Sequence, residues 1–146
     1  MMTVGNRWTL LKKNLWYSTY DNFRHGTALR RAMDDGCLDM TKAFHVGCRG
    51  SVKSKDMLIE DHEQGWTTID LDLFTDIGPV ETAQRIKKQI GDTPTIVSVD
   101  MDVLEPGECP GVGFIEAGGM TSRELFRFLR ALRGLDVIGG EVRDVK

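Results

Sequence analysis

Residues 93–104 read TPTIVSVDMDVL, a run rich in β-branched residues that predicts a strand closed by two aspartates. The segment before it, PVETAQRIKKQIG (79–91), predicts a helix, because Pro79 stands at its start, Gly91 at its end, and apolar residues recur at helical spacing between them. After a loop, TSRELFRFLRALRGL (121–135) predicts a second helix that begins with a capping box. A buried strand between two helices is typical of a parallel α/β sheet.

The rest of the chain continues this alternation. We expect a helix over residues 25–36, a buried strand over 43–50, a helix from Ser54 through Glu60, a short strand over 67–72 and a strand over 136–142. Such spacing of βαβ units predicts a mostly parallel sheet with helices on its faces, which is the α/β class. No repeat, low-complexity stretch or linker divides the chain, so we expect a single domain over residues 1–146.

Composition narrows the functional classes. The net charge of −3 arises from 19 basic and 22 acidic residues that are mixed along the chain, without the basic stripe that nucleic-acid binding requires. The cysteines, Cys37, Cys48 and Cys109, form no Cys-x-x-Cys pair and favour a reducing compartment. No apolar run has the length of a signal-peptide core or a membrane span. We expect a cytoplasmic protein that binds neither nucleic acid nor membrane, with a mitochondrial location left open.

Asp100 and Asp102 stand at the end of the central predicted strand. Ligands of open parallel sheets gather at the carboxyl ends of the strands. Residues two apart on a strand point the same way, so two carboxylates would converge and repel unless a cation lay between them. Oxygen ligands of this kind suit manganese or magnesium. The plainer alternative, in which one aspartate caps a loop and the other is solvated, is the more frequent meaning of an isolated Asp-x-Asp.

The loop after the aspartates, LEPGECPGVGFIEAGG (104–119), is longer than a simple turn and rich in glycine and proline. Loops of this length inside a compact domain are usually functional. It carries Glu105 and Glu116, and either carboxylate could bind the cationic end of a substrate, since a guanidinium group presents paired donors that match a carboxylate.

The stretch SVDMDVLEPGECPGVGFIEAGGMTSREL (98–125) resembles the ureohydrolase signature of Ser-x-Asp-x-Asp followed by Leu-Asp-Pro, Pro-Gly, Gly-Thr-Pro-Glu and Gly-Gly. The likeness continues in family order through HGTALRRAMDDG (25–36), FHVGCRG (44–50), GDTPTIVSVD (91–100) and LDVIGGEV (135–142). The chain is thereby identified as a member of the ureohydrolase (arginase and agmatinase) family, similar to agmatinases and guanidino-acid hydrolases. The resemblance covers residues 20–143 and leaves 1–19 divergent.

This resemblance implies a three-layer α/β fold of the arginase and deacetylase type. It implies hydrolysis of agmatine or a guanidino acid to urea and an amine, with a binuclear manganese (Mn2+) centre as cofactor. Asp100 and Asp102 match metal-binding aspartates of the family, and Glu116 matches the glutamate that orients the substrate guanidinium. His25 matches the active-site histidine assigned to proton transfer or substrate positioning. Family members are commonly oligomers, so a homo-oligomer is expected.

The histidines also have structural interpretations. His25, at a predicted helix start, would be taken as structural if the family were ignored. His45 precedes an apolar strand and His62 lies in a polar helix, so both are expected to be structural or solvated.

The chain departs from the family pattern in its metal motifs. The family's Asp-Ala-His-x-Asp and Gly-Gly-Asp-His segments are missing before His25, where Asp21 is the one acidic residue. The loop differs at Glu105, Val112, Phe114 and Ile115. We therefore expect a family domain truncated at both ends, with an incomplete ligand set and with activity of this chain alone in doubt.

Two alternatives stay open. The first is a catalytically inactive fragment or pseudoenzyme that binds family subunits. The second, reached without the family likeness, is a nucleotide-sugar transferase that uses Asp-x-Asp to hold a metal diphosphate, although no nucleotide-binding segment accompanies it.

Overall fold

The structure, a computed structural model, describes residues 2–6, 32, 34–50, 63 and 65–146. Its strands are β1 (Met2–Asn6), β2 (Asp39–Cys48), β3 (Thr67–Asp70), β4 (Thr95–Asp100) and β5 (Val137–Arg143). Its helices are α3 (Leu71–Ile77), α4 (Pro79–Ile90) and α5 (Ser122–Ala131), with a 3-10 turn η3 (Met101–Val103). The predicted helix from Ser54 through Glu60 lies outside the described residues, as does most of the helix expected over 25–36.

The strands form one sheet in the order β3-β2-β1-β4-β5. Strands β2 and β3 are parallel, as are β4 and β5, whereas β1 runs antiparallel to both of its neighbours, β2 and β4. All strands except β1 therefore point the same way, which confirms the mostly parallel sheet. Strand β1 was not expected, since the alternation of apolar and polar residues over Met2, Thr3 and Val4 stops at Gly5 and is too short to indicate a strand.

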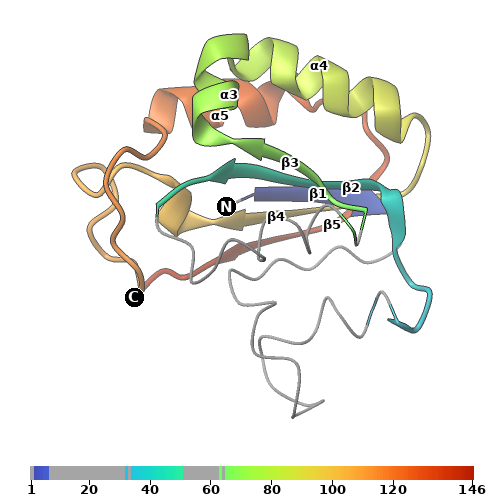
Figure 1. The fold of residues 1–146 in the computed structure, drawn as a ribbon, viewed down its shortest axis with the longest axis horizontal. Coiled ribbons are helices and arrows are strands. Elements are labelled where there is room, and N and C mark those ends of the chain that lie inside the picture. Colours follow the sequence, from blue (N-terminus) through green and yellow to red (C-terminus); the bar gives the residue numbers. More distant parts are fainter. Residues whose placement is uncertain (1, 7–31, 33, 51–62, 64) are drawn as a thin grey trace.

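Helices α3, α4 and α5 cover one face of the sheet, as Figure 1 shows. Apolar residues at helical spacing, such as Ala83, Ile86 and Ile90 of α4, are completely buried against it. The rings of Phe74 and Phe128 meet edge to face with centroids 5.7 Å apart. Burial of each large side chain contributes about 1.5–3 kcal/mol, so the packing of this helix layer on the sheet stabilises the described part of the chain.

A smaller cluster of Leu38, Ala43 and Trp66 is buried apart from the main core. His45 is 2% exposed and stacks on Trp66 with ring centroids 3.9 Å apart. This packing agrees with the structural role expected of His45. His62 lies outside the described residues.

Element boundaries follow local capping. The short strand expected over 67–72 ends at Asp70, because the Asp70 carboxylate accepts a hydrogen bond from the backbone N–H of Leu73 at 2.8 Å and starts α3. The expectation was therefore wrong for its last two residues. Helix α5 has the predicted capping box, in which the side chains and backbone N–H groups of Thr121 and Glu124 pair reciprocally.

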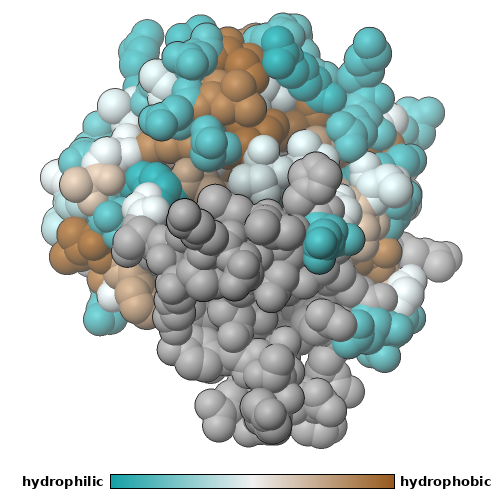
Figure 2. Space-filling view, in the orientation of Figure 1, coloured by the Kyte–Doolittle hydropathy of each residue, from teal (hydrophilic) through white to brown (hydrophobic). Residues whose placement is uncertain are grey.

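The surface on the helix side is largely hydrophilic, with hydrophobic patches between the polar side chains (Figure 2). Cys37, Cys48 and Cys109 are free thiols. Within the described residues, no helix combines the length and the apolar character that crossing a membrane requires.

Candidate active site

The carboxyl ends of the parallel strands meet at one edge of the sheet. This edge contains Cys48 of β2, Asp70 of β3, Asp100 of β4 and Arg143 of β5. Asp100 is the last residue of β4 and is completely buried. The structure thus places Asp100 where the sequence predicted it, at the end of the strand and at the edge where open parallel sheets bind ligands.

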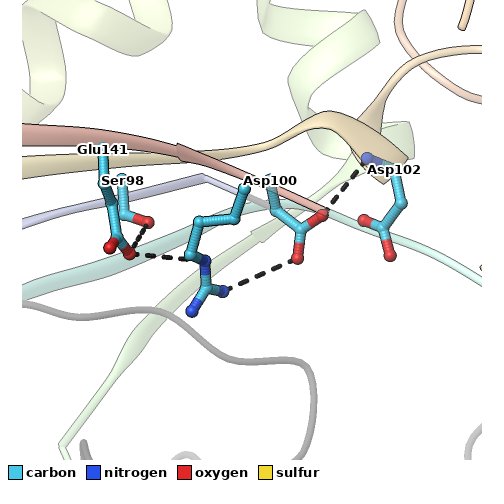
Figure 3. Close-up of polar contacts among 5 residues, drawn as sticks. Ser98, Asp100, Asp102 and Glu141 are labelled. Carbon is cyan, nitrogen blue, oxygen red and sulfur yellow. Dashed lines mark hydrogen bonds and ion pairs between the residues drawn. The ribbon is translucent and has the colours of Figure 1, made fainter. Parts of the chain in front are cut away.

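Asp102 lies beside Asp100, but for a different reason from the one expected. It belongs to the turn η3 and is 4% exposed, so the alternation of side chains along a strand does not bring the pair together. Instead, Asp100 caps the turn: its Oδ1 accepts a hydrogen bond from the backbone N–H of Asp102 at 3.2 Å. Figure 3 shows both carboxyl groups on the side of the sheet away from the helices.

Burial beside a second carboxyl group changes the ionisation of Asp100. Burial and, in addition, the neighbouring carboxyl group of Asp102 raise the pKa of Asp100 from 3.8 to about 7. A bound cation would offset the repulsion between the two carboxylates. The pair could therefore supply part of the ligand set of a cation site.

Strand β5 adds charged side chains to the same face. The β4 and β5 register pairs Ser98 with Glu141 and Asp100 with Arg143. The Ser98 hydroxyl donates to Oε1 of Glu141 at 2.6 Å, and Nε of Arg143 lies 3.3 Å from the same oxygen. Nη2 of Arg143 lies 3.6 Å from Oδ2 of Asp100. Figure 3 shows Ser98, Glu141 and Asp100 along this face.

Sequence reasoning did not single out Glu141 or Arg143. The sequence shows that the two residues are two apart on one strand. It does not show the register between β4 and β5 that places them beside Ser98 and Asp100, because the residue pattern of a single strand does not fix its pairing with a neighbour.

Glu116 lies in the loop after η3 and is half-buried. Its carbonyl oxygen accepts a hydrogen bond from Nη2 of Arg49 at 2.7 Å, and the same nitrogen donates to the carbonyl oxygen of Asp102 at 2.8 Å. The structure therefore links Glu116 to the aspartate pair through Arg49, which the sequence analysis had quoted without a role. His25 lies outside the described residues.

Glu105, the other carboxylate of the loop, has a structural role. Its Oε2 accepts a hydrogen bond from the backbone N–H of Gly119 at 2.6 Å, and its own N–H donates to Met120 at 2.8 Å. A Cβ atom on Gly119 would lie 2.3 Å from the carbonyl carbon of Leu104, so the loop closes only around a glycine here. Of the two glutamates that the sequence offered for substrate binding, Glu116 is the one not used in closing the loop.

The described residues contain no group of three or more His, Cys, Asp or Glu side chains that could hold a metal ion. What they contain is one pair of carboxylates, Asp100 and Asp102. Octahedral oxygen sites of the manganese type need more ligands than this pair supplies.

The chain is thus an α/β protein with a mostly parallel sheet and a candidate cation site, formed by two carboxyl groups at the carboxyl ends of the strands. Residues 14–146 match the model of the arginase family, and the chain belongs to that family. This confirms the family that the sequence motifs indicated.

Relatives and solved structures agree. Guanidinopropionase of Pseudomonas aeruginosa is 41% identical over 123 residues, which are 84% of this chain and 39% of that protein. The structure of proclavaminate amidino hydrolase from Streptomyces clavuligerus superposes with a TM-score of 0.75 at 33% identity, over 83% of this chain and 39% of that one. A hypothetical agmatinase from Burkholderia thailandensis superposes with a TM-score of 0.75 at 30% identity, over 90% of this chain and 40% of that one.

These neighbours confirm the arginase-type α/β fold. The chain spans about two fifths of the length of the relatives that it matches.

Proposed function

We propose that this chain contributes to the active site of a manganese-dependent ureohydrolase, which hydrolyses a linear guanidino compound to urea and an amine. The observation that carries the proposal is the pair of Asp100 and Asp102, 0% and 4% exposed, at the carboxyl edge of an arginase-family sheet.

The aspartate pair fits a divalent metal ion. Oδ1 of Asp100 accepts the hydrogen bond that shapes the turn, while its buried Oδ2 has no hydrogen-bond partner among the described residues. Oxygen atoms of this kind are the ligands that manganese prefers. Bound manganese would act as a Lewis acid and lower the pKa of a bound water molecule toward neutrality. The other ligands of a binuclear centre would come from outside the described residues.

The other carboxylates of this region are the candidates for binding the substrate. Glu116 is the first candidate for holding the guanidinium group by a charge-assisted contact. Glu141 is a second candidate, and a substrate guanidinium would there replace the guanidinium of Arg143, whose Nε lies 3.3 Å from Oε1 of Glu141. His25 would move a proton to the leaving amine.

The family and the names of the relatives, which include guanidinopropionase and agmatinase, support a linear guanidino compound as the substrate class. We propose agmatine or a guanidino acid as substrate, a homo-oligomeric assembly, and a cytoplasmic or mitochondrial location.

A second candidate function is that of an inactive family member that binds active family subunits. The observation in its favour is Arg143, whose positive charge lies beside the same Asp100 carboxylate that a metal ion would need. This candidate predicts a folded chain that takes up no manganese and associates with an active homologue.

The test is urea release by the purified chain after incubation with excess manganese, with agmatine, guanidinobutyrate and guanidinopropionate as substrates. We expect urea from at least one substrate, and a loss of at least tenfold in Glu116→Gln. A folded chain that takes up no manganese and releases no urea from any of the three would contradict the enzyme proposal and support the binding function.

A further inference from the structure

Arg49 directly follows β2, and its guanidinium group joins two segments of the chain that lie 53 to 68 residues further on. Its donors reach backbone carbonyl oxygens on both sides of the long loop. The acceptors are Asp102 at 2.8 Å, Val103 at 3.3 Å, Leu104 at 3.2 Å, Glu116 at 2.7 Å and Ala117 at 3.3 Å. One side chain therefore holds the segment of Asp102 and the segment of Glu116 at a fixed separation.

The backbone of the loop does not fix Glu116 by itself. The bonds that close the base of the loop join Glu105 with Met120 and Met120 with Val103, at 2.8 and 2.9 Å. Glu116 lies beyond that closure. Among the described residues, the hydrogen bonds to the carbonyl oxygens of Glu116 and Ala117 come from Arg49.

Gly50 fixes the side chain of the same glutamate. A Cβ atom built on Gly50 would lie 2.5 Å from Cδ and 2.7 Å from Oε2 of Glu116, so the carboxyl group lies directly on this glycine. Gly50 also has φ of 83°, a conformation that other residues rarely adopt. The main chain and the carboxyl group of Glu116 are thus both set by the two residues that follow β2.

We propose that Arg49 is a positioning residue that fixes Glu116 relative to Asp102. Within the proposed function, on which this inference rests, Arg49 sets the distance between the substrate-binding carboxylate and the metal-binding pair. An arginine is needed because its planar group presents five donors in a rigid fork, whereas the lysine ammonium is a compact group with three.

The first test is hydrogen exchange of the full chain, followed by mass spectrometry of peptides that cover residues 112–119. We expect exchange in these peptides to become at least fivefold faster in Arg49→Lys, while peptides from α4 stay unchanged. The matched control is Arg127→Lys, an exposed arginine of α5, which should leave the loop unchanged. Unchanged exchange around Glu116 in Arg49→Lys would overturn the proposal, whatever the chain binds.

The second test is the dissociation constant for agmatine of the manganese-treated full chain, in wild type, Arg49→Lys, Glu116→Gln and the double variant. If Arg49 acts through Glu116, each single change weakens binding about tenfold and the double variant binds no more weakly than Glu116→Gln. Effects that multiply would show that Arg49 acts independently and would overturn the proposal. Absence of agmatine binding in wild type would count against the proposed function instead, while the exchange result still decides whether Arg49 holds Glu116.

Discussion

Nη2 of Arg143 lies 3.6 Å from Oδ2 of Asp100, and the two residues are register partners on adjacent parallel strands. The arginine side chain is 14% exposed, so this ion pair is shielded from water. The positive charge offsets part of the cost of burying Asp100. For the same reason, Arg143 would compete with the metal ion of the proposed function for that carboxylate.

Replacing Arg143 should therefore strengthen manganese binding. We expect Arg143→Ala to lower the dissociation constant about tenfold, because removal of a nearby positive charge leaves the aspartate pair without compensation. Arg143→Lys, which keeps the charge, should stay near the wild-type value. Isothermal titration with manganese measures both. Weaker binding in Arg143→Ala would show that the arginine supports the metal site and does not compete with it.

The capping box of α5 should contribute measurably to stability. Thr121→Ala removes the side-chain oxygen that accepts the backbone N–H of Glu124 at 3.2 Å, and we expect unfolding to become easier by about 1 kcal/mol. Urea denaturation followed by circular dichroism measures this change. Arg123→Ala, at an exposed position two residues on, is the matched control, and an equal loss in both variants would contradict the assigned cap.

Gly119 should tolerate no side chain. Gly119→Ala places a methyl group 2.3 Å from the carbonyl carbon of Leu104, and the resulting shift of backbone should cost about 1–3 kcal/mol of unfolding free energy. Gly107→Ala meets nothing within 4 Å and should leave stability within about 0.5 kcal/mol. Thermal unfolding of the two variants distinguishes them, and equal melting temperatures would refute the tight closure of the loop.

Glu108 should make the free energy of unfolding depend on pH. Hydrogen bonds from the side chain and from the backbone N–H of Ser122, at the start of α5, lower the pKa of Glu108 below its ordinary value of 4.5. The folded state therefore favours the ionised form, and the stabilisation is present above pH 4.5 and is lost as pH falls through the lowered pKa.

Glu108→Gln removes that ionisation, so the variant should be less stable than wild type at pH 7, and the difference should vanish in acid. Denaturation midpoints at several pH values measure this. Asp92→Asn, at an exposed position, is the control. A difference that persists in acid would mean that the charge of Glu108 is not the cause.

Local sequence patterns predicted several of the helices and strands. The sequences of α4 and α5 contain their own start signals and apolar spacing, and α4 was predicted with nearly its observed bounds. Helix α5 begins as predicted but ends at Ala131 with Leu132 as its C-cap, so the prediction was wrong for the residues up to Leu135. Strand β1 was missed because the alternation in MTVGN covers only Met2, Thr3 and Val4, and the segment is recognisable as a strand only from its pairing with β2 and β4. Helix α3 was missed because Asp70 ends a strand and starts a helix within one residue.

The part of the candidate site formed by residues close together in the sequence was predictable, whereas the contacts between distant segments were not. The Asp-x-Asp motif placed Asp100 and Asp102 correctly, although the turn η3 brings them together and strand geometry does not. Arg49 and Arg143 were missed because their partners lie far along the chain, in a register and a loop path that only the folded structure supplies.

The most direct measurement is the manganese affinity of the purified chain beside that of Asp102→Ala, by electron paramagnetic resonance of free Mn2+. The account predicts that wild type binds manganese and that the variant loses at least tenfold in affinity while staying folded. Equal affinity in the two proteins would show that Asp100 and Asp102 are not metal ligands and would contradict the central claim.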